Sequence, residues 1–175
     1  MRQRVRPSDS VLELGCHEGV TTRLAQTLCG GAVVGVDSSE FTIGKARARW
    51  AGEAMSFARM DAFDAGAVRA LFQRQAGAGK MPSVVLIDVS GSRAAGDVCE
   101  LIGKYDRACR PRVIIVKAFK LYSLIVKAEG RLVGQSVRAP ERGASARRVG
   151  NAALTVLVAA ASFLLGGLRA RRRST

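Results

Sequence analysis

Four acidic residues and one lysine stand at the ends of short apolar runs, and their side chains are the ones best suited to chemistry. They are Glu13, Asp37, Asp61, Asp88 and Lys117. A carboxylate accepts hydrogen bonds from hydroxyl and amino groups, and a lysine beside it can stabilise developing negative charge. A lone aspartate at a strand end is more often a helix cap or turn former, so the group carries the argument rather than any one member.

The first acid belongs to the stretch VLELGCHEGVTT, residues 11–22, in which Gly15 and Gly19 follow an apolar run. Glycines between a strand and a helix allow a ligand to approach the backbone closely. The spacing differs from the dinucleotide fingerprint G-x-G-x-x-G and from the phosphate loop GxxxxGK[ST]. Glu13, placed before the glycines, suits a ligand with an ammonium group rather than a pyrophosphate.

The next two acids favour a nucleoside ligand. Asp37 ends the run VVGVD, where a carboxylate can accept both hydroxyl groups of a ribose. Asp61 lies in ARMDAF, where it can accept from the amino group of an adenine while Met60 and Ala62 flank the ring. These residues follow successive apolar runs, as expected for one ligand site built from several strand ends.

Asp88 and Lys117 end the apolar runs VVLID and RVIIVK, which places them at neighbouring strand ends. A lysine at the end of an apolar strand is unusual because burying its charge is costly without a partner. A desolvated lysine would take a proton from a hydroxyl group, whereas a charged one would act by orientation and electrostatics. The alternative is a structural lysine whose ammonium group reaches solvent.

These side chains meet only if a sheet brings the strand ends together. Apolar runs predict strands at Val11–Leu14, Ala32–Val36, Val84–Asp88 and Arg112–Lys117, with a weaker one at Met55–Arg59. Helical patterns separate them at Thr21–Leu28, Ile43–Ala51, Ala65–Gln75 and Ala94–Cys109. This alternation predicts an α/β fold with a parallel sheet covered on both faces.

The composition predicts a globular chain with a basic end. The chain has 175 residues, of which 48% are hydrophobic and 24% charged, so one domain with a real core is expected. The formal net charge is +14, and residues 131–175 hold nine arginines but a single acid, Glu141. Such an end usually binds phosphate groups, of nucleic acid first and of an anionic membrane second, although a solvated tail is the alternative.

The uncharged stretch at residues 151–168 has about the length of a membrane span and basic residues on both sides. Its alanines and its glycine pair make it a poor span. We therefore favour a final strand at 153–160 followed by a short helix, and we treat a membrane as a disfavoured partner.

The cysteines indicate no metal site. Cys16, Cys29, Cys99 and Cys109 form no CxxC pair, and the single histidine cannot complete a common zinc set. We expect reduced thiols in an intracellular compartment, cytoplasmic or nuclear. No secretory signal is predicted, because no apolar segment follows the basic N-terminus at once. The sequence leaves the oligomeric state open.

The motifs VLELGCHEGVTT, VVGVD and ARMDAF resemble motif I, motif II and the adenine-binding motif of class I S-adenosylmethionine-dependent methyltransferases. The resemblance implies a Rossmann-like, mostly parallel seven-stranded sheet with helices on both faces and an antiparallel last strand. It implies one domain over residues 1–160 and a basic tail at 161–175. The cofactor implied is S-adenosyl-L-methionine, bound by Glu13, Gly15, Cys16, His17, Gly19, Asp37, Ser38, Asp61, Ala62 and Asp88. The family usually has glycine where His17 stands, and a side chain at this position narrows the loop.

IDVS and VKAF resemble the FtsJ-like and fibrillarin-like RNA ribose 2′-O-methyltransferases, so Asp88 and Lys117 would be catalytic and RNA the acceptor. The outer members of the Lys–Asp–Lys–Glu tetrad do not match. Residues 1–10 hold three arginines but no lysine, and Asn151 stands near the place of the final Glu or His.

Other functions stay open at this point. The acceptor can be a small molecule or a protein, or the chain can be a non-catalytic RNA-binding protein on a methyltransferase fold. An N/D-P-P-Y/F signature is absent at DVSG, which argues against methylation of a base amino group. Aromatic residues make up only 5% of the chain, which argues against a strand-based stacking platform.

Overall fold

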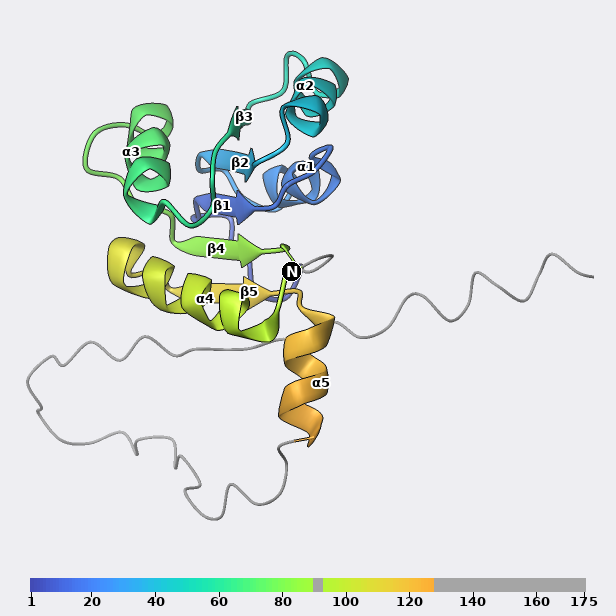
Figure 1. Cartoon of the computed structure of the whole chain (residues 1–175). Helices are drawn as coiled ribbons and strands as arrows, with labels where there is room; N and C mark the ends of the chain where they lie inside the picture. The colour runs from blue at the N-terminus through green and yellow to red at the C-terminus, as the bar shows by residue number, and fades with distance from the viewer. Residues whose placement is uncertain (90–92, 128–175) are drawn as a thin grey trace, which may run out of the picture.

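The computed structural model describes residues 1–89 and 93–127, in which five strands form one parallel sheet (Figure 1). The strands are β1 (Val11–Leu14), β2 (Val33–Asp37), β3 (Ser56–Arg59), β4 (Val84–Ile87) and β5 (Val113–Val116). The helices that follow them are α1 (Val20–Gln26), α2 (Glu40–Arg49), α3 (Ala65–Ala76), α4 (Ala95–Cys109) and α5 (Phe119–Lys127).

The order of strands across the sheet is β3-β2-β1-β4-β5, with β1 at the centre. Val11 of β1 pairs with Val33 of β2 on one side and with Val84 of β4 on the other. After β3 the chain crosses to the far side of β1, so the direction in which strands are added reverses there. In open α/β sheets, ligands bind at such a reversal, in the crevice beyond the carboxyl ends of the strands.

The sheet is covered on both faces, which explains the nearly continuous apolar sequences of its strands. Leu12 and Leu14 of β1 belong to the core that packs under α3, α4 and α5, together with Phe72 and Tyr105. The alternate residue Val11 belongs to a second cluster, formed with residues of α1 and of the segment before β1. Successive side chains of β1 therefore point to opposite faces of the sheet and belong to two separate cores.

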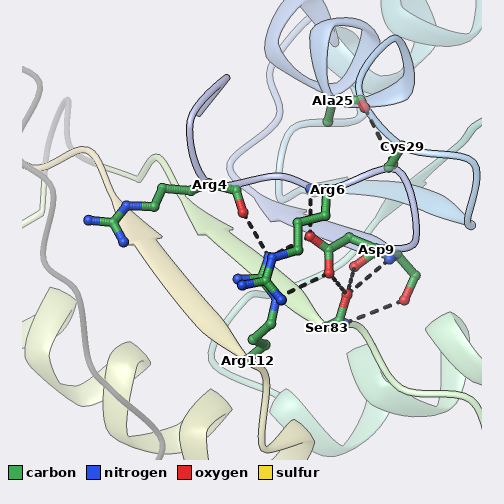
Figure 2. A network of polar contacts seen from close by, with 8 residues as sticks. Arg4, Arg6, Asp9, Ala25, Cys29, Ser83 and Arg112 are labelled. Atoms are coloured by element: carbon green, nitrogen blue, oxygen red, sulfur yellow. Dashed lines mark hydrogen bonds and ion pairs between the residues drawn. The ribbon is translucent and has the colours of Figure 1, made fainter.

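The segment before β1 is fastened to the amino ends of β1, β4 and β5 by a buried carboxylate (Figure 2). Asp9 accepts hydrogen bonds from the guanidinium of Arg112 at 2.5 and 3.3 Å, from the hydroxyl of Ser83 at 2.7 Å and from the backbone N–H of Arg6 at 2.8 Å. Arg112 also donates to the carbonyl oxygen of Arg4 at 2.7 Å. Burial alone would raise the pKa of Asp9, but these hydrogen bonds and the charge of the guanidinium together hold it below its ordinary value. We call this network the amino-terminal clasp.

The α/β class and the parallel sheet predicted from the sequence are confirmed, and the five predicted strands agree with the structure to within one residue at each end. The helix α5 was not predicted. The described residues contain five parallel strands, whereas the predicted strand at 153–160 lies outside them.

The predictions on residues 128–175 all lie outside the described part of the chain. They are the basic tail, the domain boundary after residue 160, the uncharged stretch at 151–168 and the position of Asn151. Within residues 1–89 and 93–127, no helix is both long enough and apolar enough to cross a membrane.

Candidate functional site

A cavity of about 340 Å³ opens at the carboxyl edge of the sheet, beside the point where the strand order reverses. Eight of the residues predicted to contact the ligand line it: Gly15, His17, Asp37, Ser38, Met60, Asp61, Ala62 and Asp88. They come from the segments that follow β1, β2, β3 and β4. The parallel sheet thus brings together residues that are spread over more than seventy positions of the sequence.

The carboxylate of Asp37, the last residue of β2, is held by two backbone groups. Its Oδ2 accepts from the N–H of His17 at 3.0 Å, and its Oδ1 accepts from the N–H of Ser39 at 2.9 Å. Each oxygen keeps a further lone pair, so the carboxylate can still accept from two neighbouring hydroxyl groups of a ligand.

His17 occupies a backbone conformation that favours glycine. Its φ is +49°, in the left-handed region, and its side chain is exposed. The hydrogen bond from its N–H to Asp37 offsets part of the cost of this conformation. The structure therefore shows why a glycine would fit here, and it places the imidazole at the rim of the cavity.

The residues after β3 form another wall of the cavity. Oδ1 of exposed Asp61 accepts from the N–H of Phe63 at 2.9 Å. The carbonyl oxygen of Ala62 accepts from the hydroxyl of Tyr105 at 2.9 Å, which ties this loop to α4. The guanidinium of Arg93 lies 5.0 Å from the centre of the Phe63 ring.

The sequence did not predict three of the lining residues, namely Phe63, Val89 and Arg93. Phe63 is the last residue of the motif ARMDAF, and Val89 directly follows Asp88. Both could have been predicted to line the cavity from their proximity in sequence to predicted site residues. Arg93 reaches the cavity from the segment between β4 and α4, and no spacing rule gives the direction of such a side chain.

The two glycines of the first loop have packing reasons within the protein. Gly15 has a φ of +79°, and a Cβ there would lie 2.5 Å from the carbonyl oxygen of Asp88. Gly19 has a φ of +77°, and a Cβ there would lie 2.5 Å from the ring of Phe57, with Trp50 also close. Gly15 lines the cavity, whereas Gly19 does not. From the sequence, these glycines were expected to let a ligand approach the backbone. At both positions the structure shows another part of the chain making that close approach instead.

Glu13 and Cys16, also predicted to bind the cofactor, do not line this cavity. Glu13 is 1% exposed and accepts a hydrogen bond from the hydroxyl of Thr22. Burial raises the pKa of Glu13 to about 8, against the lowering effect of that hydrogen bond. A group that is mostly protonated at neutral pH offers no full charge to an ammonium group. Cys16 is buried and packs against Gly35.

A smaller cavity of about 170 Å³ adjoins this site, since Asp88 lines both. Glu13 and Lys117 also line the smaller cavity, together with apolar residues of β4 and β5. Nζ of Lys117 lies 2.8 Å from Oδ2 of Asp88, and the lysine side chain is 67% exposed. Desolvation is not available to a side chain this exposed, so orientation and electrostatics are the roles that its position permits.

The sequence matches no protein-family model and no curated protein sequence. Similar solved structures include an S-adenosylmethionine-dependent methyltransferase from Mesorhizobium loti, which is 20% identical with a TM-score of 0.42 over 59% of this chain and 42% of that one. A methyltransferase from Thiobacillus denitrificans, in complex with S-adenosyl-L-homocysteine, is 20% identical with a TM-score of 0.39 over 58% and 39%. An rRNA methylase from Streptococcus thermophilus is 14% identical with a TM-score of 0.48 over 74% and 75%.

These values assign the chain to no family. The chain spans about two fifths of the length of the first two of these structures. Neither the activity nor the ligands of these proteins follow for this chain from likeness at this level.

Proposed function

We propose that this chain is an S-adenosyl-L-methionine-dependent methyltransferase and that its acceptor is the 2′-hydroxyl group of an RNA ribose. The observation that carries the proposal is the larger cavity. There, carboxylates from three strand ends surround one space of about 340 Å³, beside a lysine paired with one of them. The three carboxylates belong to Asp37, Asp61 and Asp88.

The hydrogen-bond acceptors of this cavity fit a cationic nucleoside better than a dinucleotide. Asp37 can accept from two ribose hydroxyl groups, and Asp61 can accept from an exocyclic amino group beside the ring of Phe63. A pyrophosphate would face the three carboxylates of the cavity. It would also face Glu18, which stands just before α1, where dinucleotide folds place their phosphates. A sulfonium ligand avoids both repulsions.

The bound cofactor would supply the methyl group and its own leaving group. The residues of the chain then have to hold the acceptor oxygen in line and stabilise the negative charge that grows on it as its proton passes to solvent water. Lys117 lines the smaller cavity beside Asp88, which lines both, and its ammonium group can stabilise that charge there. Asp88 fixes the direction of the ammonium group through the 2.8 Å contact. The smaller, apolar cavity gives the acceptor a place beside the cofactor.

The experiment begins with isothermal titration of the full chain with S-adenosyl-L-methionine. Tritiated methyl transfer to total RNA follows, with nucleoside analysis for 2′-O-methyl ribose. Lys117→Met should reduce transfer about 100-fold or more, as expected for the loss of one charge-stabilising group, and leave cofactor affinity unchanged. Lys80→Met removes an exposed lysine far from β4's carboxyl end and should leave transfer unchanged.

Each failure has its own meaning. Label in bases, proteins or small molecules would overturn the ribose acceptor and leave the enzyme. RNA binding without cofactor binding would overturn the enzyme in favour of a non-catalytic RNA-binding protein. Transfer by Lys117→Met at the parental rate would make Lys117 a structural residue.

A further inference from the structure

Three large apolar side chains are exposed around the edge of the sheet where the larger cavity opens. Val20, Phe41 and Phe119 are 58%, 71% and 74% exposed. Each is the first or second residue of a helix that follows a strand, in α1, α2 and α5. In Figure 1 these helices begin on the side to which the strand arrows point. None of the three lines the two cavities described above; each stands separately at the start of its own helix on this edge.

Basic side chains accompany both phenylalanines. Nζ of Lys45, one turn further along α2, lies 4.5 Å from the centre of the Phe41 ring. Lys117 and Lys120 stand on either side of Phe119 in the sequence, and both are exposed. Phe41 therefore lies beside a cation in space, and Phe119 has a cation close to it on each side in the sequence. We call Val20, these two phenylalanines and these three lysines the rim surface.

The carboxylates around the rim surface are balanced by its cations. Glu18 lies 3.1 Å from Lys45, and Asp88 lies 2.8 Å from Lys117. Glu40, the neighbour of Phe41, lies 4.0 Å from Arg47, while Asp37 and Asp61 line the cavity and accept backbone N–H groups. Glu18 also lies 3.7 Å from Arg49. Counted together, the cations Lys45, Arg47, Arg49, Lys117 and Lys120 therefore outnumber the carboxylates Glu18, Glu40 and Asp88. The rim offers rings and an excess of positive charge to a partner.

We propose that Phe41 and Phe119 are stacking sites for unpaired bases of single-stranded RNA, on opposite sides of the cavity. Single-stranded RNA presents base rings and phosphates in alternation, which matches isolated aromatic rings beside lysines. An apolar protein partner would instead need one continuous apolar patch, whereas these side chains come from three separate helices. The proposal rests on the proposed function for the place of the target nucleotide, which lies between the two rings at the cavity.

The test is fluorescence anisotropy of the full chain with a labelled single-stranded RNA of twelve nucleotides, at several salt concentrations. Phe41→Ala and Phe119→Ala should each weaken binding about 5- to 100-fold, as expected for the loss of one base stack. The slope of affinity against salt should not change, because the phosphate contacts remain. Lys120→Met should instead change the salt dependence: the slope of affinity against salt should fall by about 0.7, the contribution of one phosphate contact on a single strand.

Matched variants separate stacking from a general effect on the surface. Leu124→Ala removes an apolar side chain that is 54% exposed further along α5, and it should leave RNA affinity unchanged. Phe119→Trp should keep the affinity and give a fluorescence signal that is quenched when RNA stacks on the ring. Unchanged affinity in both phenylalanine variants would overturn the proposal. Binding of anionic lipid vesicles that requires the two rings, while RNA binding does not, would also overturn it in favour of a membrane surface.

The two proposals can fail separately. Cofactor binding by the parent with no effect of the phenylalanine variants on RNA would remove the stacking sites and leave the methyltransferase. Ring-dependent RNA binding by a chain that binds no cofactor would support the rim surface and remove the methyltransferase.

Discussion

The backbone N–H of His17 donates a hydrogen bond to Oδ2 of Asp37 over 3.0 Å. This bond joins the loop after β1 to the end of β2 at the cavity. Asp37 therefore holds the loop in place and also presents its carboxylate to any ligand in the cavity. A substitution at Asp37 should have two effects, one on stability and one on ligand affinity, and these can be measured apart.

Asp37→Ala should weaken binding of S-adenosyl-L-methionine about 10-fold or more, because a hydrogen bond to a charged group is worth about 1.5–3 kcal/mol. It should also lower the free energy of unfolding, since the N–H groups of His17 and Ser39 lose their acceptor. Asp37→Asn keeps one oxygen and should lose less stability. Isothermal titration and denaturant unfolding measure the two effects. Parental affinity in folded Asp37→Ala would remove this residue from the site.

Glu13 should make the protein less stable as the pH rises. Its pKa is about 8 in the fold and 4.5 in an ordinary glutamate, so between these values the unfolded chain releases a proton that the folded chain keeps. Glu13→Gln replaces the titratable carboxyl group by an amide and keeps an oxygen that can accept from Thr22. The unfolding free energy of the variant minus that of the parent should increase from pH 5 to pH 8, as measured by urea unfolding. Glu53→Gln, on the surface, is the control. A difference that stays constant with pH would show that Glu13 is ionised in the fold.

Asp9 should show the opposite dependence on pH. Its pKa in the fold lies below the ordinary 3.8, so its stabilising effect is complete above about pH 4 and is lost as the pH falls through the lower value. Asp9→Asn should cost about 2 kcal/mol at pH 7, because Arg112 loses its charged partner. Thermal unfolding should show this cost shrinking toward pH 3. Asp106→Asn, exposed on α4, should show no such trend.

Gly15→Ala should be far more damaging than a positive φ alone explains. Gly52 has a φ of +84° with nothing within 4 Å of an added Cβ, so Gly52→Ala isolates the backbone cost of about 1 kcal/mol. At Gly15 the added Cβ would also meet the carbonyl oxygen of Asp88 at 2.5 Å and push β1 away from β4. Urea unfolding should show at least twice the loss for Gly15→Ala. Equal losses would mean that the strand ends adjust freely.

The sheet and the meeting of Asp37, Asp61 and Asp88 could be predicted because both follow from local pattern. Apolar runs of β-branched residues give buried strands, and parallel strands place their carboxyl ends at one edge. The pair of Asp88 and Lys117 follows from the same rule, since β4 and β5 are neighbours.

The rest depends on contacts between distant parts of the chain. The spacing around Glu13 gives its place in β1 but not the burial that raises its pKa. The sequence suggested that Gly19 faces a ligand. Its real neighbour is the ring of Phe57 on β3, which is distant in sequence and could not be predicted from the loop itself. The helix α5 was not predicted because VKAFK continues an apolar strand without a capping residue. For the same reason the exposure of Phe119, its first residue, was not predicted.

The amino-terminal clasp also sets an order of assembly. Val11 can find Val33 early, whereas Asp9 and Ser83 are 74 positions apart, and Asp9 and Arg112 are 103 apart. The entropy cost of closing a loop rises with its length, so β1, β2 and β3 should associate first and the clasp should form last. Pulsed hydrogen exchange during refolding should protect amides of β1 and β2 before the amide of Ser10, which donates to the hydroxyl of Ser83 at 3.0 Å. The reverse order would contradict this sequence of events. During synthesis, the segment that holds Arg4 and Asp9 would wait until Arg112 has been made, so an early part of the sheet is closed by a residue that arrives about a hundred positions later.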